Sequence, residues 1–127
     1  MVETGRTVAS PGVLTTKDRA KLDQLRRASL ALSEARLVLL GPAYANQIPD
    51  EKIDEVLDVC TRIMTAVMRI DSAQLSLIIR KIDPNIAALR KATAELEVEI
   101  RSVRRINQVL QLATAVLGII SKFLVVF

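Results

Sequence analysis

The chain has 127 residues and a formal net charge of +4; 50 % of its residues are hydrophobic and only 2 % are aromatic. A single Cys and the absence of His exclude an internal disulfide, a zinc site and a His-based catalytic triad. The length fits one domain with a core of its own. The hydrophobic half is almost wholly Leu, Ile, Val and Ala, which favours helices over sheet.

The basic residues are concentrated in the second half of the chain. Residues 1–58 carry eight basic and nine acidic side chains, whereas residues 59–127 carry ten basic and five acidic ones. Neither aromatic residues nor Gly alternate with the basic positions, as they do on many surfaces that bind nucleic acid. We therefore do not expect nucleic acid to be a partner.

The first fourteen residues mix Thr, Ser, Gly and Pro without a long apolar run. Such a segment lacks the apolar core of a secretory signal peptide. We therefore expect residues 1–14 to form a flexible arm, followed by a helical bundle over residues 15–106.

The first helix is predicted over residues 16–40. Thr15 and Asp18 have the spacing of a capping box, and apolar residues then recur at steps of three and four. Gly41 and Pro42 interrupt the pattern and are predicted to end the helix.

A second helix is predicted over residues 50–82, with a broad apolar face that suits burial against two neighbours. Asp50, Glu51, Asp54 and Glu55 crowd its first turns. Carboxylates at a helix start are stabilised by the helix dipole, so we interpret them as structural rather than as a catalytic or metal site. Cys60 lies on the apolar face and is expected to act as a small hydrophobic residue.

Pro84 is predicted to mark a sharp corner before a third helix, which runs over residues 84–106 and onward. The predicted fold is therefore all-α, a three-helix antiparallel bundle or hairpin. A long helix kinked at Pro84 is the alternative, because the apolar spacing continues in phase across the proline.

The third helix carries a heptad pattern typical of a coiled coil. We interpret its apolar stripe as a seam between copies of the chain. A polar residue at a core position can fix register, so Asn107 could pair with its own copy or could instead face water. The predicted seam comprises Ile86, Leu89, Leu96, Ile100, Val103, Asn107 and Leu110.

Residues 107–127 continue the third helix and are apolar on every side. A second helix of the predicted length would leave the last eleven residues uncovered, so they would need a lipid, a second copy or a partner. We interpret the segment as a candidate membrane anchor. Thr114 and Gly118 could allow such helices to pack closely. The basic residues expected at the membrane surface are Arg101, Arg104 and Arg105.

The sequence lacks a Gly-rich phosphate loop, a GxSxG motif and metal-ligand spacing. We therefore expect no catalytic activity, no cofactor, no metal and no small-molecule ligand. The expected function is that of a helical interaction or scaffold protein that associates with itself and, through its C-terminal helix, with the cytoplasmic side of a membrane.

Two alternatives remain open. The chain could be a soluble cytoplasmic adaptor or assembly subunit whose apolar end is buried by another helical protein or by copies of itself. It could also be a membrane-active, pore-forming protein, because amphipathic helices together with an apolar one can perforate a bilayer.

Overall fold

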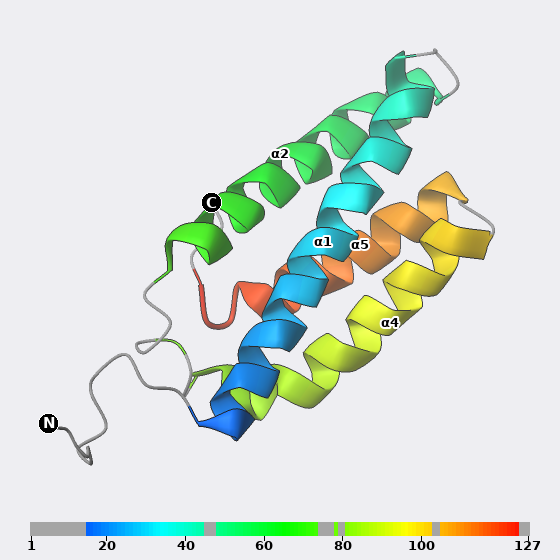
Figure 1. Ribbon diagram of the computed structural model, residues 1–127. Helices are drawn as coiled ribbons and strands as arrows, with labels where there is room; N and C mark the ends of the chain where they lie inside the picture. Colours follow the sequence, from blue (N-terminus) through cyan, green and yellow to red (C-terminus); the bar gives the residue numbers. More distant parts are fainter. Residues whose placement is uncertain (1–14, 45–47, 74–77, 79–80, 103–104, 125–127) are drawn as a thin grey trace, which may run out of the picture.

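The computed structural model describes residues 15–44, 48–73, 78, 81–102 and 105–124, and every regular element in these ranges is helical. The prediction of an all-α bundle is confirmed (Figure 1). The elements are α1 (Thr16–Tyr44), α2 (Asp50–Ser72), the 3-10 helix η2 (Asp83–Asn85), α4 (Ile86–Ser102) and α5 (Ile106–Ile120).

The helix α1 begins at the predicted cap, where the Thr15 hydroxyl oxygen accepts a hydrogen bond of 3.0 Å from the Asp18 backbone N–H. It ends at Tyr44 rather than at residue 40, and Pro42 lies within its last turn. A proline there removes one backbone hydrogen bond. Leu39, which is fully buried, holds this end of the helix in the core.

The helix α2 ends at Ser72, so the prediction of one helix through residue 82 is wrong. Ala73 has extended backbone angles, with φ −68° and ψ 141°. Residues 74–77 and 79–80 lie outside the described residues, and the backbone is helical again at Ile78, Lys81 and Ile82. The apolar spacing continues in phase across this interruption, which is why periodicity alone did not reveal it.

The predicted sharp corner at Pro84 is also wrong. Both Ile82 and Ile86 have helical backbone angles, and the chain passes through Pro84 as the short helix η2. The chain instead changes direction between α2 and Lys81. The helix α4 then packs against α1 and α5.

The long C-terminal helix is broken in two. The helix α4 ends at Ser102, and Arg105, just before α5, is extended, with φ −69° and ψ 123°. Glu99 holds the turn, because its carboxylate accepts a hydrogen bond of 2.9 Å from the Arg105 backbone N–H and pairs with the Arg105 guanidinium at 3.1 Å. The helix α5 therefore returns alongside α4 (Figure 1).

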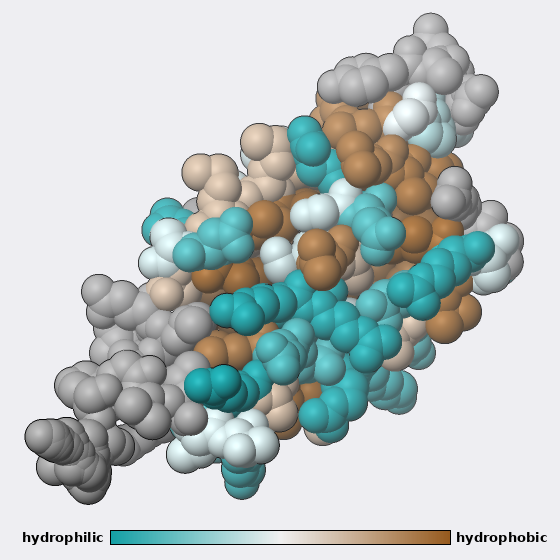
Figure 2. Space-filling view, in the orientation of Figure 1, coloured by the Kyte–Doolittle hydropathy of each residue, from teal (hydrophilic) through white to brown (hydrophobic). Residues whose placement is uncertain are grey.

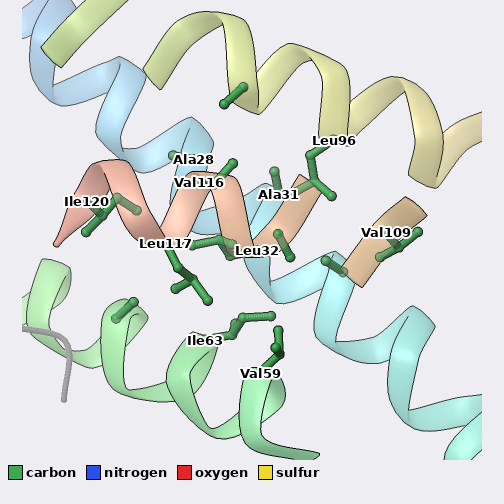
Figure 3. Packing of buried hydrophobic residues seen from close by; sticks show 14 of the residues in the cluster. Ala28, Ala31, Leu32, Val59, Ile63, Leu96, Val109, Val116, Leu117 and Ile120 are labelled. Carbon is green, nitrogen blue, oxygen red and sulfur yellow. The ribbon is translucent and has the colours of Figure 1, made fainter. Parts of the chain in front are cut away.

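The apolar helix α5 packs one side against α1, α2 and α4 and leaves its other side exposed. In Figure 3, Val116 and Leu117 of α5 lie among side chains from the three other helices. The expectation that the end of the chain protrudes uncovered is wrong for the described residues, since even Phe123 is only 5 % exposed. The buried residues of α5 are Val109, Leu110, Ala113, Val116, Leu117 and Ile120.

The contact between α1 and α5 is built partly from small side chains. Ala28, Ala31 and Ala35 of α1 and Ala113 of α5 are all buried. Ala28 and Ala31 lie beside Val116 in Figure 3. Alanine at these positions lets the two helix backbones approach closely without a void.

Candidate interaction surface

The predicted seam residues are used mainly within one chain. Leu89, Leu96, Ile100 and Leu110 belong to the buried core, while Ile86 is half-buried. Asn107 is exposed, and Val103 lies outside the described residues. Packing of α4 against α1 and α5 therefore accounts for the heptad spacing without a second copy.

The predicted membrane-flanking residues Arg101 and Arg105 are exposed, and Arg104 lies outside the described residues. Hydrogen bonds from the Arg105 side chain and backbone hold the pKa of Glu99 below its ordinary value. Arg105 thus serves the turn before α5. No helix in the described part of the chain is long and apolar enough to cross a membrane.

Thr114 and Gly118 lie on the exposed side of α5. The Thr114 hydroxyl donates a hydrogen bond of 2.7 Å to the Leu110 carbonyl of its own helix. A methyl group added at Gly118 would meet no atom within 4 Å. The two residues therefore face outward, and no described residue of this chain packs closely on Gly118.

The described residues contain few groups that are suited to catalysis or to metal binding. No group of three or more Cys, Asp or Glu residues is placed there to hold a metal ion. Burial raises the pKa of the Cys60 thiol, which keeps the thiol protonated. A cavity of about 650 Å³ between the starts of α2 and α5 is lined in part by Lys52 and Arg105. Lys52 pairs with Glu55, and Arg105 pairs with Glu99.

The two flanks of α1 differ in character. Toward α4, ionic contacts join the helices: the Arg27 guanidinium binds the nearly buried Glu97 carboxylate at 2.7 Å. At the end of the same flank, Lys21 pairs with Asp83 of η2 at 2.7 Å. The hydrogen bond from Lys21 holds the pKa of Asp83 below its ordinary value.

The flank of α1 toward α2 is apolar at the surface. Of six exposed large hydrophobic side chains among the described residues, five lie on these two helices. Figure 2 shows apolar side chains gathered over α2 and the second half of α1, and hydrophilic ones over the first half of α1 and α4. We define the outer face as Leu30 and Leu37 of α1 with Leu57, Met64 and Met68 of α2.

A shallow groove of about 200 Å³ runs between the two helices of the outer face. Met64 and Met68 form one wall, together with Ile63 and Val67. Ser33 and Arg36 of α1 form the other wall, and Leu30 and Leu37 flank Ser33 along that helix.

Part of the outer face lacks charge, although Arg36 lines its groove. Residues 28–33 of α1 and 63–68 of α2 contain no charged side chain, and charged residues precede and follow each segment. Depletion of charge at the centre, enrichment in Met and a charged rim are features of protein interfaces.

Hydroxyl groups of α2 near the outer face are already hydrogen-bonded. Thr61 donates to the Leu57 carbonyl at 3.0 Å, and Thr65 donates to the Thr61 carbonyl at 3.1 Å. A group whose hydrogen bond is made within its own helix loses less when water is removed than an unpaired group does. Covering these two hydroxyl groups therefore costs little desolvation free energy.

The outer face was not predicted from the sequence. Leu57 and Met64 fell within the broad apolar pattern of the second helix, which we expected to be covered by neighbours, and Leu30 lay off the apolar stripe of the first. The signal was present as apolar residues on more than one side of each helix. Whether these apolar residues are buried depends on which helices lie against α2. The helix α4 lies on the other side of α1 and so does not cover them (Figure 1).

Comparisons of the chain with protein-family models, with curated proteins and with solved structures find no match. The surface itself is therefore the basis for a functional proposal.

Proposed function

We propose that the chain is a non-enzymatic helical interaction protein that works as a scaffold by associating with itself. The observation that carries the proposal is the outer face. Leu30, Leu37 and Met68 are between 65 % and 67 % exposed, although the chain already has a core of its own. Large apolar side chains gathered in one patch are typical of a surface that binds another protein.

Sedimentation of the full chain over a wide range of concentration tests this function. We expect reversible association, with the mean mass rising with concentration. A monomer at every concentration would overturn the proposal, because the outer face would then remain exposed to water.

Membrane association is the second candidate, and one observation favours it. Residues 106–121 contain no charged side chain, so moving α5 into a bilayer would not carry the free-energy cost of burying a charge. The helix would first have to leave the core, where Val116 and Ile120 are fully buried. This candidate therefore requires the bundle to open at the membrane.

Flotation with anionic liposomes tests the second candidate. Recovery of the chain with the liposomes, resistant to an alkaline carbonate wash, would support insertion of α5. Release of a trapped dye would point to the pore-forming alternative. Full recovery of the chain in the unbound fraction would reject both.

A further inference from the structure

We infer that a second copy of this chain docks along α2, with the two α2 helices antiparallel and a two-fold axis at Thr61. Such docking rests on the proposed self-association and names the helix that carries the contact. The exposed apolar row of α2 consists of Leu57, Met64 and Met68. Thr61 lies in the same row, since the four residues follow one another at steps of four, three and four.

A second row runs along α2 beside the apolar row. This charged row consists of Asp54, Asp58, Arg62, Thr65 and Arg69. Its members follow one another at steps of four, four, three and four, so they share one side of the helix. The apolar row borders α1, because its two methionines line the groove between the two helices. The charged row therefore lies on the side of the exposed surface that faces away from α1.

The sign of the charge changes at the middle of the charged row. Asp54 and Asp58 precede Thr61, whereas Arg62 and Arg69 follow it. A two-fold axis between antiparallel helices keeps each row on its own side, so the charged rows of the two copies meet in reverse order. Asp54 stands seven residues before the axis and Arg69 eight residues after it, so the two lie opposite each other across the contact. By the same symmetry, Asp58 lies opposite Arg62 of the copy.

Two of these charges have no partner within the chain. Asp54 and Arg69 are exposed, and no described residue forms an ion pair with either. Asp58 pairs with Arg62 of its own helix at 3.2 Å, so the dimer brings two such pairs together at its centre. Complementary charges across an interface fix its register and suppress other partners. The unpaired charges of α2 are therefore matched by a second α2 in the opposite direction.

The charged row also selects one position of the axis. With the axis one turn earlier, Asp58 would meet Asp58 of the copy. With the axis one turn later, Arg62 would meet Arg69 of the copy. Like charges that face each other across an interface weaken it, so the axis at Thr61 is favoured over both of these registers.

The middle of the contact suits burial. The Thr61 hydroxyl donates to the Leu57 carbonyl at 3.0 Å, so its donor is satisfied before the second copy arrives. Leu57 stands four residues before the axis and Met64 three residues after it, so Leu57 of each copy packs against Met64 of the other. Apolar contacts at the centre with charged residues beside them are the usual arrangement of a protein interface.

A cysteine at the axis gives the most direct test. A residue on a two-fold axis meets its own copy, so Thr61→Cys should form a disulfide-linked dimer of the full chain under mild oxidation. Val98→Cys is the matched control, because Val98 is 65 % exposed but belongs to α4, outside the proposed contact. It should give far less covalent dimer, and the unchanged chain, whose Cys60 is buried, should give none. Electrophoresis without reductant measures the yield.

An exchange of charges tests the register. Asp54→Arg and Arg69→Asp should each raise the dimer dissociation constant about fivefold to tenfold, because each places like charges together twice across the contact. A chain with both substitutions should regain the original constant, since opposite charges face each other again. A mixture of the two single variants should form a heterodimer in preference to either homodimer. Sedimentation measures the constants, native mass spectrometry measures the preference, and circular dichroism checks that every variant stays folded.

The outcomes distinguish this contact from the proposed self-association. If the unchanged chain stays monomeric at every concentration, both fail. If the chain associates but Thr61→Cys gives no more covalent dimer than Val98→Cys, α2 is not the contact, while self-association stands. The same conclusion follows if the two charge substitutions together fail to restore association.

Discussion

The helix α1 has two flanks that were built differently. Toward α4 it is joined by charged pairs that reach between helices, such as Arg27 with Glu97. Toward α2 its surface is largely apolar, and Arg36 is the charged residue that lines the groove there. Ion pairs between helices define how elements of one chain sit together, whereas exposed apolar side chains add nothing to that arrangement. The difference supports the proposal that the second flank contacts another molecule.

The largest expected effect contrasts a core leucine with an outer one. Leu96 of α4 is fully buried, so Leu96→Ala should lower the free energy of unfolding by about 2–5 kcal/mol through lost packing and a cavity. Leu30→Ala, at an exposed position, should change it by no more than about 0.5 kcal/mol. Urea unfolding of both variants at low concentration measures the contrast. Equal losses would mean that the outer face belongs to the core.

Gly118 lies on a third surface, the exposed side of α5, which belongs to neither flank of α1. Because an added methyl group meets nothing within 4 Å, Gly118→Ala should stabilise the chain by about 0.5–1 kcal/mol through helix propensity. Association should be unaffected. A loss of association on this substitution would instead place the contact on α5, through the predicted close packing of Thr114 and Gly118.

Acid should weaken the charged flank and spare the apolar one. The pKa of Asp83 is lowered in the folded chain, so its contribution to stability is present above its unfolded pKa of about 3.9 and is lost as the pH falls through the folded value. The pKa of Lys21 is raised, so the contribution of this pair is lost again at strongly alkaline pH.

Asp83→Asn tests the acid effect. The variant should melt slightly below the unchanged chain at neutral pH, and the difference should vanish once the pH has fallen below the lowered pKa of the folded Asp83 carboxyl group. Asp71→Asn is the control, because Asp71 is exposed and forms no ion pair among the described residues. Thermal melts across the pH range give both curves. A difference that persists in acid would contradict a role for the Asp83 charge.

The smallest effect concerns the hydroxyl groups beside the outer face. Thr65 already donates to the carbonyl of its own helix, so Thr65→Val should change stability by no more than about 0.5 kcal/mol. Association should become slightly tighter, because a methyl group replaces the hydroxyl near the contact. Weaker association on sedimentation would indicate that the hydroxyl binds the partner.

Local patterns predicted the helices, and tertiary contacts decided where they end. The Thr15 cap and the apolar spacing of α1 are local signals, and they predicted where this helix begins but not that it continues to Tyr44. The break before α5 carries neither Gly nor Pro. It depends on the Glu99 carboxylate reaching the Arg105 backbone, a contact that exists only once the chain has turned.

The candidate surface could be predicted only in part. The sequence shows that Leu57 and Met64 are apolar, but burial depends on which helix lies beside them. The return of α5 into the bundle places it, rather than another copy, against Val59 and Ile63 on the inner side of α2 (Figure 3). The leucines and methionines left outside are known only once that arrangement is known.

The alanines between α1 and α5 have a further consequence for how this chain can vary. Because these alanines are buried where α1 meets α5, a bulkier residue at Ala28, Ala31 or Ala113 would have to displace its neighbours in the core. Side chains on the opposite side of α1 face no such limit. Exposed positions on that side can therefore change while the spacing of α1 and α5 stays the same.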